Sequence, residues 1–245
     1  MEFILEVENV EKRYGAKRVV DKVSFVAAKG ECLGIIGPNG AGKTTLFNVL
    51  DGSVALDGGK VKVRGVDVST LPQYRRARLG IGRAYQIPLP FFGLSVFENV
   101  LVGVLHGPPE VRSGGERRAL EILETVGLTG KLKLPAAGLP LLDRKRLELA
   151  KAMSIGTDVL LLDEIAAGLT EQEVLELIEI VKALKHDHAV LWIEHIAHAL
   201  TAAADRILVL HFGAKLREGT PAEVMHDPLV QEVYLGIAVD EPDYA

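Results

Sequence analysis

The chain contains the run Gly37-Pro38-Asn39-Gly40-Ala41-Gly42-Lys43-Thr44-Thr45. It matches the consensus G-x-x-x-x-G-K-[ST] and lies between an apolar run, Cys32–Ile36, and a segment with helical character, Lys43–Leu50. Glycines let backbone N–H groups surround phosphate oxygens at the positive end of the following helix. Lys43 would add charge at the β- and γ-phosphates, and the Thr44 hydroxyl would ligate Mg²⁺. The run therefore predicts a nucleotide phosphate site, in preference to a glycine-rich turn with an incidental lysine.

The composition around this loop is that of a globular protein. Of 245 residues, 48% are hydrophobic and 25% are charged, and the formal net charge is −5. The negative charge argues against a protein that neutralises nucleic-acid phosphates. Cys32 is the only cysteine, which excludes an intrachain disulfide and a cysteine-based zinc site. We expect neither a signal peptide nor a membrane span, because Met1–Val7 is acidic and no long apolar run occurs.

Hydrophobic patterns predict strands on both sides of the loop. Alternation typical of half-buried strands occurs in Phe3–Val10, Val19–Val26 and Lys60–Arg64. Short apolar runs typical of buried strands are Val159–Leu162, Val190–Ile193 and Ile207–Leu210.

The middle of the chain has a different character. Prolines interrupt it, and helical periods occur in Gly115–Val126 and from near Pro140 to Met153. We therefore predict one domain over 1–245, in which a helical subdomain of about 87–154 is inserted into an α/β core of about 1–86 and 155–236. The acidic end, 237–245, is expected to be loose.

Two carboxylates end the buried run Val159–Leu162. An acid beside a phosphate loop can hold Mg²⁺ through water, which is the role predicted for Asp163. Glu164 would polarise an attacking water as general base. His195 closes the next strand and would sense the γ-phosphate. The alternative for each of these residues is a solvated side chain that merely ends a strand. Taken by itself, His195 fits this alternative better than the Asp163 and Glu164 pair does.

Three further groups have structural interpretations. We interpret His186 and His188 as a solvated turn rather than as metal ligands. The charge run Arg75–Arg78 is interpreted as a solvated face. Thr220–Glu223 predicts a capping-box helix start with proline at the first helical position.

In this order, the motifs resemble those of ABC-type ATPases, from about Val7 to Gly236. The resemblance implies ATP and Mg²⁺ as ligands, and it implies these site residues: Walker A, Gly37–Thr45; Walker B, Asp163 and Glu164; D-loop, Ala167–Thr170; switch histidine, His195; catalytic and Mg²⁺-binding Q-loop glutamine, Gln86; adenine-stacking aromatic, Tyr14. The fold it implies is α/β, a P-loop NTPase with a RecA-like mixed sheet, an N-terminal antiparallel β subdomain and an inserted helical subdomain.

Finer features are similar to the ATP-binding subunits of branched-chain amino acid importers, a branch that also serves urea, amide and aromatic-acid uptake. They are Pro38–Asn48, Phe97–Val100, Ala166–Leu169, Ile193–His195 and Glu218–Gly236. The resemblance implies transmembrane permease subunits, a second ATP-binding subunit that is identical or paralogous, and, indirectly, an extracytoplasmic solute-binding protein. It implies no nucleic-acid partner, and a peripheral location on the cytoplasmic face of the inner membrane. Lipopolysaccharide-export ATPases, non-transport ABC clamps and a regulatory subunit with little turnover are the alternatives.

The family's signature, usually Leu-Ser-Gly-Gly-Gln, is altered here. The register that fits begins at Leu139, with Pro140 in place of serine and Leu142 in place of glycine. The similar run at Ser113 lies too far upstream, and Ser113 with Glu116 has a sufficient explanation as a capping box. We therefore hypothesise an asymmetric ATPase whose own Walker motifs work, while the opposite site, completed by Leu139–Asp143, is impaired.

The apolar run Ile87–Phe97 directly follows Gln86. One interpretation is ordinary core between subdomains. The other is a partly exposed groove that receives a cytoplasmic helix of the permease. Gln86 would then report γ-phosphate occupancy to that groove.

Overall fold

The computed structural model describes residues 3–235, so the tail predicted for 237–245 lies outside the described residues. The strands are β1 (Phe3–Tyr14), β2 (Lys17–Ala28), β3 (Cys32–Ile36), β4 (Gly58–Val63), β5 (Val66–Asp67), β6 (Ile81–Ala84), β7 (Val159–Asp163), β8 (Ala189–Ile193), β9 (Arg206–His211) and β10 (Ala214–Gly219). The helices are α1 (Lys43–Asp51), α2 (Gln73–Arg78), α3 (Val96–His106), α4 (Pro109–Arg112), α5 (Gly115–Thr125), α6 (Leu141–Ser154), α7 (Glu171–Leu184), α8 (Ala197–Ala203), α9 (Pro221–Met225) and α10 (Pro228–Val230). Short helical turns are η1 (Thr129–Lys131), η2 (Ala136–Gly138) and the π-helical η3 (Gln231–Leu235).

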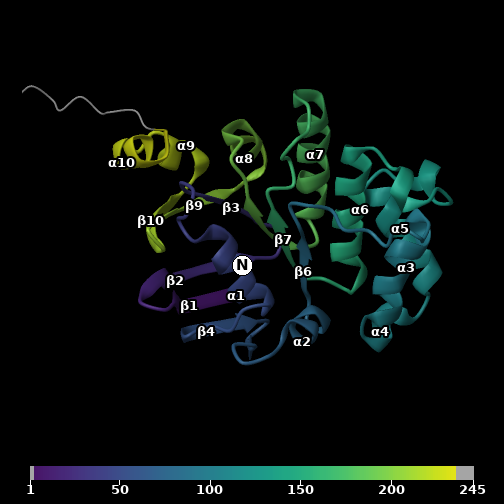
Figure 1. The fold of residues 1–245 in the computed structure, drawn as a ribbon, viewed down its shortest axis with the longest axis horizontal. Helices are drawn as coiled ribbons and strands as arrows, with labels where there is room; N and C mark the ends of the chain where they lie inside the picture. Colours follow the sequence, from purple (N-terminus) through teal and green to yellow (C-terminus); the bar gives the residue numbers. More distant parts are fainter. Residues whose placement is uncertain (1–2, 236–245) are drawn as a thin grey trace, which may run out of the picture.

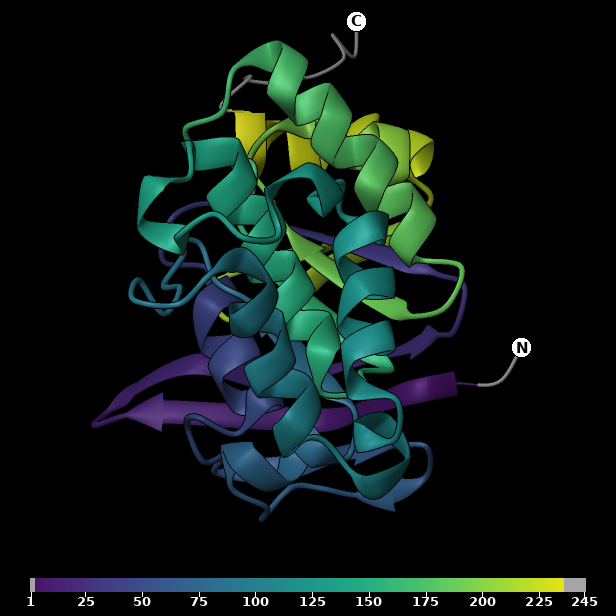
Figure 2. The ribbon, with the colours of Figure 1, turned by 90° about the vertical axis from the view of Figure 1, so that its right-hand side faces the viewer.

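These elements build two sheets (Figure 1). Strands β2, β1, β4 and β5 form an antiparallel sheet in that order, and β10, β9, β3, β8, β7 and β6 form a mixed sheet in which only β10 runs antiparallel to its neighbour. Helices α3 to α6 gather beyond β6, at the right of Figure 1 and at the front of Figure 2. The predicted fold class is confirmed.

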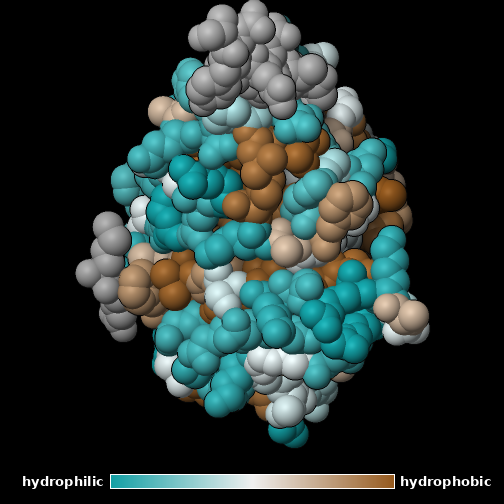
Figure 3. Space-filling model, turned by 90° about the vertical axis from the view of Figure 1, so that its left-hand side faces the viewer, coloured by the Kyte–Doolittle hydropathy of each residue, from teal (hydrophilic) through white to brown (hydrophobic). Residues whose placement is uncertain are grey.

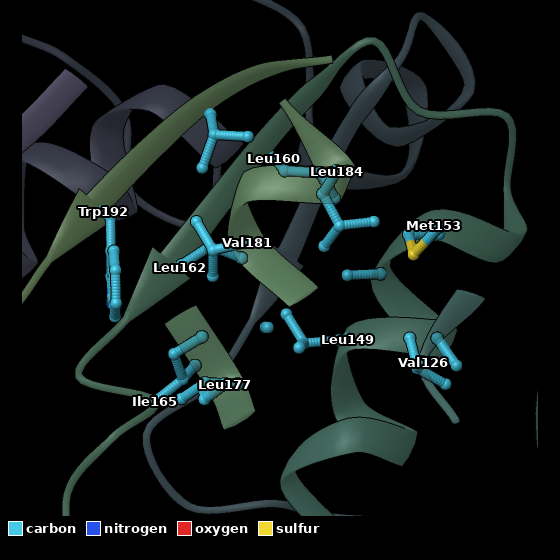
Figure 4. Close-up of a cluster of buried hydrophobic side chains, with 14 of the residues drawn as sticks. Val126, Leu149, Met153, Leu160, Leu162, Ile165, Leu177, Val181, Leu184 and Trp192 are labelled. Atoms are coloured by element: carbon cyan, nitrogen blue, oxygen red, sulfur yellow. The ribbon is translucent and has the colours of Figure 1, made fainter. Parts of the chain in front are cut away.

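The central strands β3, β8 and β7 of the six-stranded sheet are buried on both faces. Along β7, Val159 and Leu161 pack in the cluster that contains α1 and the antiparallel sheet, while Leu160 and Leu162 pack in the cluster that contains α6 and α7. Figure 4 shows this second cluster, where Leu160 and Leu162 meet side chains such as Val181 of α7. Each such side chain contributes about 1.5–3 kcal/mol on full burial. Burial on both faces explains why these strands read as continuous apolar runs.

The surface at the left of Figure 1 is largely hydrophilic, with hydrophobic residues interrupting its middle (Figure 3). Within residues 3–235, no helix is long and apolar enough to cross a membrane.

Two local predictions are wrong in detail. The residue before α5 is Gly114, in the left-handed region at φ 71°, and no side chain caps the helix, so Ser113 and Glu116 form no capping box. Arg76 is only 1% exposed, because its guanidinium donates to the carbonyls at the end of α1, and therefore it is no solvated charge. The helix predicted from near Pro140 is α6, and Pro140 is its N-cap. The capping box predicted at Thr220 is confirmed.

Candidate nucleotide site

The predicted site residues converge at one edge of the mixed sheet. Strands β3, β8, β7 and β6 are parallel neighbours, so their carboxyl ends meet there. Gly37 follows β3, Asp163 ends β7, and Gln86 and His195 come shortly after β6 and β8. Ligands of open α/β sheets bind in the crevice outside these strand ends. The topology therefore brings together residues that are far apart in the sequence.

The phosphate loop has the conformation that its glycines were expected to allow. Gly42 lies at φ 100°, and a Cβ at that position would approach the carbonyl oxygen of Val19 to 2.3 Å. The loop lines a cavity of about 250 Å³ together with Lys17, Val19 and Glu164. Lys43 lies in this loop with its ammonium donating to the carbonyl oxygens of Gly37 (2.7 Å) and Pro38 (3.2 Å).

The surroundings of the Lys43 ammonium favour the binding of an anion. Burial lowers its pKa, and the carboxylates of Glu164 and Asp163 oppose that shift. A phosphate would offer the ammonium stronger partners than two carbonyls, since charge-assisted hydrogen bonds are roughly twice as strong as neutral ones. The contacts of Lys43 with its own loop would then be exchanged for contacts with the nucleotide.

Glu164 lies between the two other residues predicted to act in catalysis. Gln86 donates from Nε2 to one carboxylate oxygen of Glu164 at 2.5 Å, and Nε2 of His195 is 3.0 Å from the other. The backbone of Glu164 is in the left-handed region at φ 46°, which is uncommon for a residue with a side chain. Such strain clusters at functional sites. In this site the carboxylate of Glu164 is therefore hydrogen-bonded to two side chains, Gln86 and His195, and either of these bonds can break.

Asp163 has a partner that sequence reasoning missed. Arg83, on the neighbouring strand β6, donates from Nη2 to Oδ2 of Asp163 at 2.5 Å and from Nη1 to Asp51 at 2.8 Å. Burial alone would lower the pKa of Arg83, but its hydrogen bonds to Asp163 and Asp51 outweigh burial and raise it. No local pattern marks Arg83, because its partners come from α1 and β7.

The oxygen donors at this edge suit Mg²⁺. The hydroxyl of Thr44, the side-chain oxygen of Gln86 and the carboxylate of Asp163 are hard ligands, and Mg²⁺ typically takes one or two protein groups besides waters and phosphates. Only Oδ2 of Asp163 is bonded to Arg83, which leaves Oδ1 for a metal-bound water. Among residues 3–235 there is no cluster of three or more His, Cys, Asp or Glu side chains that could hold a metal. His186 is exposed in the turn before β8, whereas His188 is half-buried, with its Nδ1 2.7 Å from the carbonyl oxygen of Leu184.

Tyr14 ends β1 and is 51% exposed, with the Lys12 ammonium 5.5 Å from its ring centre. As far as the described residues go, the lining of the 250 Å³ cavity does not include it. Its role in adenine stacking stays a prediction.

The first turn of α6, where the altered signature lies, contains little that could bind phosphate. Pro140 makes no side-chain capping bond, Leu141 is 42% exposed and Leu142 is 9% exposed. Asp143 is 2% exposed and is paired with Lys131 and, at 3.7 Å, with Arg146. The polar side chains of this turn are therefore engaged within the chain.

One face of α6 holds the segment after Gln86. Lys145, 2% exposed, donates to the backbone carbonyl of Gln86, and further along the helix Lys151 donates to that of Leu89 at 2.7 Å. Four apolar side chains of this segment are exposed by half or more: Ile87, Leu89, Phe91 and Phe92. The interpretation as ordinary core is wrong for these four residues. Lys145 was not singled out from the sequence, because its partner belongs to a distant loop.

Comparison with known proteins agrees with this geometry. Residues 20–167 match the ABC transporter family, and residues 218–240 match the branched-chain amino acid ATP-binding cassette transporter family. The chain belongs to the ABC transporter family. As an ABC ATPase cassette, it carries the family's nucleotide-binding fold over nearly all of its described length.

Curated relatives of this ABC cassette cover almost the whole chain. The high-affinity branched-chain amino acid transport ATP-binding protein LivG of Salmonella typhimurium is 36% identical, over 96% of this chain and 98% of the relative. BraF of Pseudomonas aeruginosa, which has the same descriptive name, is 35% identical over the same shares. The crystal structure of MJ1267 in its ADP conformation, an ATP-binding cassette of an ABC transporter, superimposes with a TM-score of 0.86 at 29% identity, covering 97% of this chain and 100% of that one.

Proposed function

We propose that this cassette hydrolyses ATP to drive a membrane importer of branched-chain amino acids or a related amide, urea or aromatic-acid solute. The observation that carries the hydrolytic part is the placement of Glu164 beside the phosphate cavity, between Gln86 and His195. The choice of solute rests on the relatives, which are named as branched-chain amino acid transport proteins.

The residues suggest how the reaction proceeds. Backbone N–H groups of Gly37–Thr45 and the ammonium of Lys43 bind the phosphates. Glu164 accepts a proton from a water whose oxygen attacks the γ-phosphorus, and ADP leaves as the bond to the β-phosphate oxygen breaks. Gln86 and His195, which are hydrogen-bonded to Glu164 here, would turn to the γ-phosphate when the nucleotide binds. Mg²⁺, held by Thr44 and through water by Asp163, would neutralise charge on the phosphates.

A permease helix would dock beside the Gln86 segment. A cavity of about 360 Å³ opens there, and its lining includes Tyr74, Tyr85 and Ile155. The exposed side chains of Ile87, Leu89 and their neighbours suit an apolar helix face better than solvent. Docking of this kind would place the chain on the cytoplasmic face of the membrane as a peripheral subunit.

A second ATP-binding subunit, identical or paralogous, would complete the assembly. With Pro140 and Leu142 in the signature, the site formed by this chain's α6 and the partner's Walker motifs would lack a hydroxyl donor and a close backbone approach. The proposal is therefore an asymmetric pair in which the nucleotide held by this chain is hydrolysed and the opposite one is hydrolysed poorly.

Steady-state ATP hydrolysis by the purified chain tests these proposals, with Glu164→Gln as the control for contaminating ATPases. Activity that disappears in the variant shows that two identical copies form a working site, which contradicts the asymmetric pair and leaves the ATPase assignment intact. ATP binding without hydrolysis supports the need for a partner. Absence of ATP binding contradicts the proposed function altogether.

A further inference from the structure

Arg83 has a set of contacts that nucleotide binding alone does not require. Its side chain is 5% exposed and bridges two carboxylates that are also buried, Asp51 (4%) and Asp163 (8%). Nη1 also donates to Oδ1 of Asn48 at 2.8 Å. Within the part of the chain that the structure describes, Nε has no hydrogen-bond partner.

A lysine in place of Arg83 could not make the same set of contacts. The guanidinium is planar and presents its donors in a rigid fork, whereas an ammonium is a single point charge. Here the fork holds Asp51, at the end of α1, and Asp163, at the end of β7, at a fixed separation. Without a cation between them, two buried carboxylates would repel each other or take up a proton.

The same guanidinium reaches the cavity proposed to receive the permease. Its Cζ lies 4.7 Å from the centre of the Tyr85 ring, a distance typical of a cation–π contact. Asp51, Arg83 and Tyr85 all line that 360 Å³ cavity. Gln73 completes the connection, because its Nε2 lies 3.3 Å from Asp51 and 3.0 Å from the Tyr85 hydroxyl oxygen. One side chain therefore contacts both the cavity wall and the predicted magnesium-binding aspartate.

We infer that Arg83 is a positioning residue that orients Asp163 toward Mg²⁺ and links that orientation to the wall of the docking cavity through Tyr85. By holding Oδ2, it would keep Oδ1 available to a metal-bound water. This inference rests on the proposed nucleotide site, and it adds a route between permease and metal that is separate from Gln86.

The test measures metal affinity rather than turnover. In a Glu164→Gln background, which prevents hydrolysis, Mn²⁺ is titrated into the protein–ATP complex and followed by electron paramagnetic resonance, and ATP affinity without metal is measured in EDTA. Loss of a residue that orients a metal ligand typically weakens metal binding by 10-fold to 100-fold, so we expect Arg83→Gln to weaken Mn²⁺ binding by about 10-fold or more. ATP affinity in EDTA should stay unchanged. Equal or tighter Mn²⁺ binding would overturn the inference.

Arg76→Gln is the matched control, because Arg76 is also a buried arginine near the end of α1 but donates to backbone carbonyls and not to Asp163. It should lower stability without changing Mn²⁺ affinity. If Arg83→Gln does not fold, Arg83→Lys takes its place and should still weaken Mn²⁺ binding, by a smaller factor; an unchanged affinity would contradict the role of the fork.

The link to the cavity is tested with Tyr85→Leu. Loss of one cation–π contact should weaken Mn²⁺ binding by about threefold when Arg83 is present and have no effect in Arg83→Gln. Equal effects in both backgrounds would refute the link. Failure of the Glu164→Gln parent to bind ATP in EDTA would overturn the proposed function itself and this inference with it.

Discussion

The carboxyl edge of the mixed sheet and the first turn of α6 are both proposed to take part in ABC nucleotide sites, yet they differ in chemistry. At the sheet edge, Lys43 and Glu164 face a cavity and their present partners are ones that a nucleotide can displace. In the first turn of α6, Leu142 and Asp143 are buried, and the carboxylate of Asp143 is already paired with Lys131. One region is arranged to exchange partners on binding, whereas the other has its polar groups satisfied within the chain. The difference favours an ATPase that works at the site it holds itself.

The largest expected effect concerns the sheet edge. Replacing Glu164 by Gln keeps the size of the side chain but removes the proton acceptor, so ATP hydrolysis by the assembled transporter should fall by about 10²–10⁴-fold with ATP binding retained. Phosphate release and ATP titration measure the two quantities. The control is Glu171→Gln, an exposed position at the start of α7. A fall of less than tenfold would remove Glu164 from the proposed role.

The next effect concerns Glu194, which lies beside His195 and is 2% exposed. Burial raises the pKa of Glu194 from 4.5 to about 7. Because the folded state binds this proton more tightly than the unfolded state does, the stabilisation is full below pH 4.5 and is lost as the pH rises through 7. Glu194→Gln should therefore exceed the wild type in free energy of unfolding at pH 8 by roughly 2–3 kcal/mol, and match it near pH 4.5.

Urea unfolding at both pH values measures this difference. Glu171→Gln serves again as the control and should leave the pH dependence unchanged. A Glu194→Gln curve parallel to that of the wild type would show that folding does not raise the pKa of Glu194.

A smaller effect is expected where α6 meets the sheet edge. Burial lowers the pKa of Lys145, so Lys145→Met removes a charge that is costly to bury and should not reduce stability. It also removes the donor that holds the Gln86 carbonyl, and hydrolysis should fall by about tenfold because Gln86 would no longer be held in place beside Glu164. The free energy of unfolding and kcat are both measured for Lys145→Met. The control is Lys133→Met, at an exposed position. Loss of stability without loss of kcat would make Lys145 merely structural.

The smallest effect tests the altered signature itself. The double substitution Pro140→Ser with Leu142→Gly restores a hydroxyl and a close backbone approach. Hydrolysis by the assembled pair should rise about twofold, as a second site begins to work alongside the first. Pro140→Ser alone, which leaves Leu142 in place, is the control and should have less effect. Unchanged hydrolysis in the double variant would contradict the asymmetric pair.

Much of the sheet edge could be predicted from sequence because each residue there follows its own strand. The run Gly37–Thr45 and the pair Asp163 and Glu164 are local patterns, and the parallel topology brings local patterns at strand ends to one place. The apolar runs identified the strands because both faces of the sheet are covered.

Contacts between distant segments could not be predicted in the same way. Arg83 reads as one polar residue in a short strand, and Lys145 as one of several charges on a helix; their roles depend on partners that only the folded chain supplies. Arg76 shows the opposite error, since a run of arginines suggested solvent whereas carbonyls at the end of α1 accept its hydrogens.

The strand order has a consequence for how the protein reaches its native state. Strand β3 pairs with β8, so Cys32 lies opposite Val190, and β6 pairs with β7, so Ile81 lies opposite Val159. The entropy cost of closing such long loops must be met before the strand contacts form, and this makes folding slow. Until the strands pair, their edges are exposed. The nucleotide site forms only when all four strands have met. ATP will therefore bind the finished chain and not its intermediates, and the nucleotide will stabilise the native state in proportion to its concentration over Kd.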